Sequence, residues 1–301
     1  MVSLPFQKPG RFYRGNLHTH SSNSDGRLSP DEVVDLYRTQ RYDFVAITDH
    51  FSAQWDYQIT DSTSLRSEGF TTLIGAELHT PALANGQPWH LVAAGLPLDF
   101  AGPSANETGP QLAARAAEAG AFVGIAHPAW YDLLLEEARS VEAAHAVEIY
   151  NETCVALNDR GESWYIADML LAEGRRLTGF GSDDLHQTAE DRSDAFGAWV
   201  WVRAETLSPD ALLDALKAGD YYTSQGPLIH DISFDGGEIA VSCSPARSIY
   251  LTGRAARAER LHGHGLVEAR FPTDLFEGSY CRVTVVDSAG QRAWSNPIWL
   301  D

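Results

Sequence analysis

Residues 11–20 read RFYRGNLHTH, a short apolar run that ends in two histidines. The segment Arg11–Leu17 is typical of a buried strand, because it carries large apolar side chains without a helical period. His18 and His20 are two positions apart on an extended chain, so their side chains point to the same side. The motif therefore predicts a strand end at which two imidazoles can hold one metal ion.

Similar strands recur along the first two thirds of the chain, and helical patterns separate several of them. One helix is predicted to begin after Ser29, where Pro30 and Glu32 complete a capping box. Further helices are predicted over 111–119, over 159–173 and after Ser208. Unalternated apolar strands in alternation with helices indicate an α/β fold with a parallel sheet, and seven such strands favour a barrel. The predicted strands are Arg11–Leu17, Phe44–Thr48, Thr72–Glu77, His90–Ala94, Ala121–Ala126, Ala146–Tyr150 and Leu177–Gly181.

Acidic and imidazole side chains follow strand after strand in this pattern. His50 comes directly after the second strand, Glu77 ends the third and His127 follows the fifth. In a barrel the carboxyl ends of the strands converge on one face, where active sites lie. Chance rarely places such residues at five or six strand ends, so the sequence predicts one shared site for several metal ions. The candidate ligands are His18, His20, Asp25, His50, Glu77, His127, Glu148, Asp184 and His186.

The composition narrows the class of protein. The chain has 301 residues, which suits one large domain or a large domain with a small one. Its formal net charge of −19 argues against binding to nucleic acids or to anionic membrane surfaces. The sequence contains no apolar run of the roughly 20 residues that a membrane helix needs, and the start resembles no secretory signal. Three scattered cysteines suit a reducing compartment, so we expect a cytoplasmic protein.

The pattern changes after Gly226-Pro227. Short apolar runs, separated by turn signals such as Asp235-Gly236-Gly237, replace the alternation of strands and helices. We therefore expect a barrel over residues 1–226 and a small β-sandwich-like domain over residues 227–301. The motif His262-Gly263-His264 repeats the spacing of the first histidine pair, but it has no converging partners, so we expect the second domain to stay outside the catalytic shell.

Seven motifs follow one another in a characteristic order: His18-Thr19-His20, Ser24-Asp25-Gly26, Thr48-Asp49-His50, Gly75-Ala76-Glu77, Ala126-His127-Pro128, Glu148-Ile149-Tyr150-Asn151 and Asp184-Leu185-His186. In order and spacing they resemble the PHP (polymerase and histidinol phosphatase) superfamily over residues 13–225. The resemblance implies a distorted (β/α)7 TIM-like barrel with a centre of two or three Zn, Mn or Fe ions, and a hydrolase that is most often a phosphoesterase. The segments 218–227, 243–245 and 293–298 resemble the carbaryl-hydrolase-like (CehA/McbA) branch.

The resemblance also implies how the ligands divide among three ions. His18, His20, Glu77 and Asp184 would hold the first ion, Glu77, His127 and Glu148 the second, and Asp25, His50 and His186 the third. Two departures from the family pattern leave alternatives open. Many relatives have His or Cys in place of Glu148, and one extra residue before the last motif makes Asp183 a competitor of Asp184. The reaction is expected at His18, His20, Glu77, Asp184 and His186.

Three further residues are placed around this site. His79 lies two positions after Glu77, and we assign it to substrate contact at the rim rather than to a metal ion. Arg192, in a polar loop after His186, is the candidate contact for an anionic substrate. His90 begins a strand and is expected to sit in a structural hydrogen bond.

The ligand chemistry indicates the kind of reaction. Imidazole and carboxylate ligands suit Zn²⁺, Mn²⁺ or Fe²⁺ and do not distinguish among them. Three divalent ions and four carboxylates leave a local charge of about +2, which favours a compact anion. We expect a metal-bound hydroxide to attack a small phosphate ester. The alternatives are a carbamate, carboxylic ester or amide hydrolase with the same centre, and a metal-stabilised binding or regulatory module that is not an enzyme.

Overall fold

The computed structural model describes residues 4–187 and 193–301 and places the predicted strands in one sheet. The strands that follow the seven predicted runs are Arg11–Asn16 (β1), Phe44–Ile47 (β2), Thr71–Leu78 (β4), Leu91–Ala94 (β5), Phe122–Ile125 (β6), Ala146–Asn151 (β7) and Thr178–Ser182 (β8). Each lies within one residue of its predicted ends. Further strands are His50–Phe51 (β3), Trp199–Ala204 (β9), Tyr221–Ser224 (β10), Ile229–Asp235 (β11), Glu238–Gly253 (β12), Ala258–Pro272 (β13), Tyr280–Val286 (β14), Arg292–Ser295 (β15) and Ile298–Trp299 (β16).

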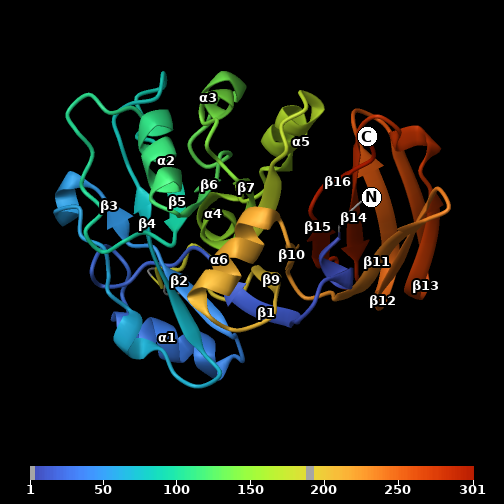
Figure 1. The fold of residues 1–301 in the computed structure, drawn as a ribbon, viewed down its shortest axis with the longest axis horizontal. Coiled ribbons are helices and arrows are strands. Elements are labelled where there is room, and N and C mark those ends of the chain that lie inside the picture. Colours follow the sequence, from blue (N-terminus) through green and yellow to red (C-terminus); the bar gives the residue numbers. More distant parts are fainter. Residues whose placement is uncertain (1–3, 188–192) are drawn as a thin grey trace.

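The sheet runs in the order β11-β12-β14-β15-β10-β9-β1-β2-β4-β5-β6-β7-β8, and β3, β13 and β16 pair outside this path. Figure 1 shows the strands before β11 surrounded by helices and the later ones gathered at one side of the molecule. The helices are Pro30–Thr39 (α1), Gly109–Glu118 (α2), Leu135–Ser140 (α3), Glu152–Asn158 (α4), Trp164–Ala172 (α5) and Pro209–Ala218 (α6). No helix in the described part of the chain is long and apolar enough to cross a membrane.

The helix boundaries confirm the predicted caps and correct one helix. At the start of α1, the Ser29 hydroxyl accepts from Glu32 N, and the Glu32 carboxylate accepts from Ser29 N at 2.8 Å. The predicted helix over 159–173 is wrong at its beginning. Asp159 adopts a left-handed backbone (φ 62) that ends α4, and the chain resumes a helix only at Trp164.

The strand directions differ from the parallel sheet that the sequence predicts. The strand β5 runs antiparallel to both β4 and β6, and β9 runs antiparallel to β1. Residues 79–90 connect β4 to β5 without a helix, and parallel neighbours normally need a helical crossover. As a result Leu91, at the start of β5, pairs with Leu78 at the end of β4. The beginning of β5 therefore lies on the rim where β4 ends.

Strands from distant places in the sheet order share one interior. Leu17, which follows β1, and Phe44 of β2 pack in the same hydrophobic cluster as Phe122 of β6 and Phe180 of β8. The space is filled closely, since a Cβ atom on Gly15 would lie 2.2 Å from the Phe44 ring. The sheet therefore curls around a common core, as the barrel prediction requires.

The predicted barrel is nevertheless left open by the backbone. In the described residues β8 ends the sheet path and forms no strand ladder with β9 or β10. Side chains join β8 to β10 instead. The Thr223 hydroxyl accepts from Gly181 N at 3.1 Å and donates to Gly179 O at 3.2 Å, and the Tyr221 hydroxyl donates to Thr178 Oγ1 at 2.7 Å. This seam replaces the missing ladder.

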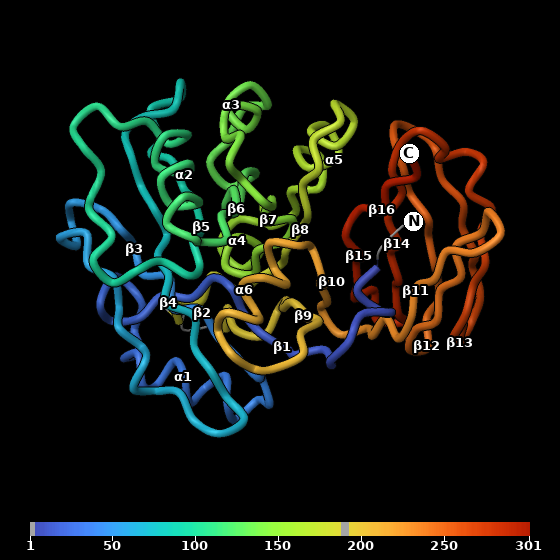
Figure 2. Tube along the Cα trace, viewed as in Figure 1, coloured from blue at the N-terminus to red at the C-terminus, as the bar shows by residue number. Residues whose placement is uncertain are grey.

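The C-terminal strands extend the same sheet rather than forming a separate one. The strand β15 pairs antiparallel with β10, and residues 238–253 form the single long strand β12. Leu4 and Phe6, near the start of the chain, pack in the hydrophobic cluster of these strands. Figure 2 accordingly shows both chain ends at this side of the molecule.

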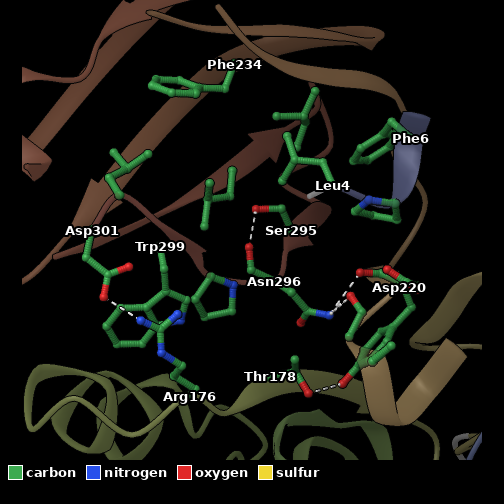
Figure 3. A pocket seen from close by; sticks show the side chains of 18 of the residues that line it. Leu4, Phe6, Arg176, Thr178, Asp220, Phe234, Ser295, Asn296, Trp299 and Asp301 are labelled. Carbon is green, nitrogen blue, oxygen red and sulfur yellow. Dashed lines mark hydrogen bonds and ion pairs between the residues drawn. The ribbon is translucent and has the colours of Figure 1, made fainter. Parts of the chain in front are cut away.

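A cavity of about 920 Å³ lies between the C-terminal strands and the seam side of the sheet (Figure 3). It contains none of the candidate metal ligands. Asn296 in its wall accepts from Gly179 N and donates to the carbonyls of Gly219 and Tyr221, at 3.0–3.1 Å. This side chain therefore serves to tie the C-terminal strands to β8 and to the start of β10.

We expect Thr223→Val to destabilise the fold by about 1–3 kcal/mol, because it leaves the buried amide of Gly181 without its acceptor. Valine keeps the shape of threonine, so the loss reports the hydroxyl. Urea unfolding measures the effect, with Thr252→Val on β12 as the control. An equal, small change in both variants would show that the seam hydroxyl contributes nothing to stability.

Candidate metal centre

The candidate residues converge on the rim where the parallel strands end. The segment after β1 and the segment after β8 lie side by side, because His20 N donates to Leu185 O at 2.8 Å and Asp184 N donates to His18 O at 3.0 Å. The strand β4 contributes Glu77, and the other residues follow or begin neighbouring strands. The structure brings together His18, His20, Asp25, His50, Glu77, His79, His90, His127, Asp184 and His186.

Asp184 and the first two histidines form a buried group. Asp184 Oδ1 lies 3.1 Å from His18 Nε2 and 2.9 Å from His20 Nε2. All three atoms are buried without a hydrogen-bond partner in the described residues. Ligands about 2.0–2.2 Å from one ion lie roughly 3 Å from one another, so these separations suit a shared cation.

Glu77 joins two further groups. Its Oε1 lies 2.7 Å from His90 Nδ1 and 3.0 Å from His127 Nε2. Its Oε2 lies 2.7 Å from His50 Nδ1 and 3.3 Å from His79 Nε2. Because Oε2 also lies 3.7 Å from His20 Nε2, the carboxylate stands between the His90–His127 pair and the Asp184 group and is placed to bridge two cations.

The group at the opening of the site is less buried. Asp25, whose side chain is 44% exposed, lies 3.3 Å from both His50 Nε2 and His186 Nε2. The side chains of His50 and His186 are 19% and 13% exposed, whereas those of His18 and His20 are fully buried. The centre therefore runs from a closed floor at Asp184 to an open rim at Asp25.

Protonation at the floor differs from one histidine to another. Burial lowers the pKa of His18, but Asp184 and Glu148 outweigh it and hold this pKa well above its usual range. His20 and His90 are shifted toward the neutral form instead. Burial lowers the pKa of His20 to about 3 and that of His90 to about 4. Burial raises the pKa of Glu77 and of Asp184, but the surrounding histidines outweigh it and hold both well below the usual range. Neutral imidazole and ionised carboxylate are the forms in which these groups bind metal ions.

At the rim the carboxylates prevail over burial, as they do at His18. Burial lowers the pKa of His50 and of His186, but nearby carboxylates outweigh it and raise these values to about 10 and about 9. Glu77 and Asp25 act on His50, and Asp25 and Asp184 act on His186. The clustered carboxylates thus require positive charge, which either protonated imidazole or a metal ion can supply. The donor set and its unpartnered atoms fit divalent ions.

Two ligand candidates occupy a backbone conformation that is uncommon for residues other than glycine. Asp184 has φ 55 and His127 has φ 22. Such residues persist where their surroundings hold them in place and are frequent at functional sites. Here the amide of His127 is held by Glu148 Oε2 at 2.7 Å, and that of Asp184 by His18 O.

Glu148 lies behind the centre rather than in it. Its Oε1 contacts His18 Nδ1 at 3.0 Å and the Ser182 hydroxyl, and its Oε2 accepts from His127 N and from Asn151 Nδ2 at 3.1 Å. Both oxygens are therefore occupied by protein groups, and Glu148 belongs to none of the ligand groups in the described residues. Glu148, the ligand candidate that the sequence left uncertain, therefore orients His18.

The structure separates Asp183 from Asp184. The Asp183 oxygens accept from the Tyr37 hydroxyl at 2.7 Å and from the amides of Phe196 and Gly197 at 2.8 Å. Asp183 thus points away from the histidines and anchors the segment before β9. Asp184 is the one that faces the cluster, in agreement with the preferred sequence assignment.

Sequence reasoning missed His90 as a member of the cluster. It does form the hydrogen bond that was expected, but its partner is Glu77 at 2.7 Å. The miss follows from the assumption that every strand is parallel, which would put the start of β5 on the opposite rim. Tyr131 covers this histidine with its ring, at 5.0 Å between centroids.

Supporting residues were also invisible in the sequence. Asp49 accepts from Ser21 and Ser24 at 2.6–2.7 Å and so shapes the loop that carries Asp25. Asp194 accepts from His186 N at 2.8 Å. Both are acidic residues near a motif, and only their hydrogen bonds distinguish them from ligands.

The remaining residues singled out in the sequence lie in different parts of the molecule. His79 is in the cluster, with 10% of its side chain exposed. Arg192 lies outside the described residues. His262 and His264 are exposed on β13, where the Ser248 hydroxyl lies 2.9 Å from His262 Nδ1.

No family model and no curated protein matches the sequence of this chain. A two-domain protein from Bacteroides vulgatus, described as containing a predicted PHP-like metal-dependent phosphoesterase, has a similar structure. The TM-score is 0.53 at 18% identity, and the match covers 95% of this chain and 94% of that chain. The likeness shows a common fold over nearly the whole chain.

Two smaller matches cover 60% of this chain. One is a proposed metal-dependent phosphoesterase from Bifidobacterium adolescentis, with a TM-score of 0.43, 17% identity and 90% of that chain covered. The other is an amidohydrolase from Chromobacterium violaceum with bound sulfate and no metal, with a TM-score of 0.43, 15% identity and 89% of that chain covered.

We expect Asp184→Asn and Asp183→Asn to fail in different ways. Asp184→Asn should lower the bound metal by at least one equivalent, because it weakens the charge that faces His18 and His20. Asp183→Asn should keep the metal and destabilise the fold by about 1–3 kcal/mol, because an amide cannot accept from all the donors around it. Metal analysis and thermal unfolding of both variants measure this. Metal loss in the Asp183 variant at unchanged stability would contradict it.

We also expect His90→Ala to lose an ion that Glu148→Gln retains. Removing His90 takes a nitrogen from Glu77 and His127, whereas Glu148→Gln removes a charge behind His18 and should weaken binding about 10- to 100-fold. Zn²⁺ titration against a chromophoric chelator compares the two. If only the Glu148 variant lost an ion, the original sequence assignment would stand.

Proposed function

We propose that this chain is a metal-dependent hydrolase of the PHP superfamily, acting as a phosphoesterase on a small-molecule phosphate ester. One observation carries the proposal: Asp184 Oδ1, His18 Nε2 and His20 Nε2 face one another, buried and without hydrogen-bond partners in the described residues. The fold shared with the Bacteroides protein, whose description includes a PHP-like phosphoesterase, supports it.

We assign two or three divalent ions, of Zn, Mn or Fe, to three sets of ligands. His18, His20, Glu77 and Asp184 form the first set, Glu77, His90 and His127 the second, and Asp25, His50 and His186 the third. The second set departs from the sequence assignment, because His90 takes the place of Glu148. The reason is that the Glu148 oxygens are already engaged by His18, Ser182, His127 and Asn151.

Divalent ions in such a centre lower the pKa of a coordinated water and polarise the oxygens of a phosphoryl group. The protein's own contribution is to fix which nitrogen each imidazole presents. Glu148 Oε1 holds the Nδ1 proton of His18, and the Asp184 carbonyl holds that of His186 at 2.7 Å. When both rings are neutral, their Nε2 lone pairs therefore face the cluster.

The exposed rim indicates where substrate enters. Asp25, His50 and His186 are the accessible members of the centre, so the third set lies nearest to solvent. Three divalent ions with the carboxylates of Asp25, Glu77, Glu148 and Asp184 leave a local charge of about +2. The chain as a whole carries −19. A compact anion is therefore attracted to the centre, while an extended polyanion is repelled by the rest of the surface.

Two further expectations from the sequence, the location of the protein and the role of the C-terminal residues, belong to the same proposal. The three cysteines are unpaired and buried, which fits the cytoplasmic location expected from the sequence. Residues 227–301 are taken as an appendage outside the catalytic shell, and the variant with both His262→Ala and His264→Ala serves as the control for all site variants.

We expect a higher kcat/KM for para-nitrophenyl phosphate or bis-para-nitrophenyl phosphate than for carbaryl, because the centre favours an anionic ester over a neutral one. Single-stranded DNA should be cleaved little at physiological salt. One metal-loaded preparation is assayed on these compounds and on naphthyl acetate. His20→Ala should abolish the activity, and the His262/His264 double variant should keep it within a few-fold.

The same panel separates the alternatives. Turnover of carbaryl or naphthyl acetate without cleavage of any phosphate ester would assign the centre to carbamate or carboxylic ester hydrolysis. Bound metal with no turnover of any compound would favour a binding or regulatory module.

A further inference from the structure

An imidazole that binds a metal through one nitrogen normally has its other nitrogen fixed by a hydrogen bond. Two of the assigned ligands show this directly. His18 Nδ1 meets Glu148 Oε1 at 3.0 Å, and His186 Nδ1 meets the Asp184 carbonyl at 2.7 Å. In each case Nε2 is left for the cluster.

His50 is oriented in the same sense. Its Nε2 lies 3.3 Å from Asp25 Oδ2, on the side of the third ligand set. Its ring also lies against that of His20, at 4.3 Å between centroids. The Nδ1 atom points the other way, to His79 Nε2 at 2.8 Å and to Glu77 Oε2 at 2.7 Å.

Glu77 is the less suitable partner for the Nδ1 proton. Its Oε1 is contacted by His90 and His127, and its Oε2 also lies 3.7 Å from His20 Nε2. The carboxylate is thus placed between the first and second ligand sets, where cations draw on its charge. His79 meets those sets at Glu77 Oε2, which lies 3.3 Å from its Nε2, and edge-on at the His90 ring, at 4.5 Å between centroids.

The chain delivers His79 to this place by strand geometry. Glu77 belongs to β4, and His79 lies two positions after it, directly beyond the end of that strand, so both side chains leave the same side. The side chain of His79 is only 10% exposed. It is therefore held beside His50, whereas the sequence favours a substrate contact at the rim.

We propose that His79 is a positioning residue for the metal centre: its Nε2 accepts the Nδ1 proton of His50, so that His50 presents Nε2 to the ion held with Asp25 and His186. The inference rests on the proposed function in one respect, the assignment of that third ligand set. It makes His79 neither a direct metal ligand nor a substrate contact.

The test compares His79→Ala, His79→Gln and His50→Ala in the full chain. Glutamine carries an acceptor oxygen at about the reach of Nε2, so it restores the hydrogen bond without the imidazole. Zn²⁺ affinities are measured by competition with a chromophoric chelator, and the visible absorption of Co²⁺ reports the ligand geometry. His264→Ala, on β13, is the matched control for loss of a histidine.

We expect His79→Ala to weaken one Zn²⁺ ion by about 10- to 100-fold and to shift the Co²⁺ spectrum. His79→Gln should bind that ion within about threefold of the wild type, because the acceptor is restored. His50→Ala should lose the ion altogether, and His264→Ala should match the wild type. Circular dichroism checks that each variant is folded. If His79→Ala does not fold, His79→Gln keeps the test decisive.

Two results would overturn the proposal. Loss of a whole ion in both His79 variants, as in His50→Ala, would make His79 a direct ligand. Unchanged Zn²⁺ binding in both variants, with a raised KM for para-nitrophenyl phosphate, would make it a substrate contact. The test measures metal binding. A wild-type chain that binds metal but cleaves no ester would therefore refute the proposed hydrolase function and leave the proposed role of His79 standing. A wild-type chain that binds no metal refutes both.

Discussion

The interaction on which the rest of this structure depends is the burial of Glu77 among imidazoles. Only 1% of this residue is exposed, and nitrogens of four histidines lie within 3.3 Å of its two oxygens. A carboxylate in such a place is stable only if positive charge is supplied close by. The strand directions, the loop supports and the ring orientations all bring groups to this one carboxylate.

The open seam between β8 and β10 is compatible with bringing these groups to Glu77. A closed ladder between β8 and β10 would fix both strands along their length, whereas side chains join them at a few points, Thr223 at Gly179 and Gly181 and Tyr221 at Thr178. The end of β8 is then free to turn toward β1, where Asp184 N bonds to His18 O. The turn requires the left-handed backbone of Asp184, and it is this turn that sends Asp183 and Asp184 to opposite sides.

The sequence predicts the strands well because each is a short apolar run between turn residues, and such runs are visible locally. It also predicts most of the cluster, since a ligand that follows a parallel strand is marked by its position. It does not reveal the direction of β5, which depends on how residues 79–90 return, and His90 was misjudged for that reason alone. The broken helix at Asp159 and the exact partners of Glu148 likewise depend on contacts between distant segments.

Position in the sequence does not distinguish a carboxylate that binds metal from one that supports a loop. The number of hydrogen-bond donors that reach its oxygens does. Asp49, Asp183 and Asp194 each receive hydrogen bonds from amides or hydroxyls on their carboxylate oxygens, so these oxygens are occupied by donors of the protein. Asp184 Oδ1 receives none in the described residues and faces two imidazole nitrogens instead. The first kind of carboxylate holds a loop, and the second kind requires a cation. The same distinction places Glu148 with the supports, although its motif resembles that of a ligand, and it applies wherever a histidine motif carries more acidic residues than a metal centre can use.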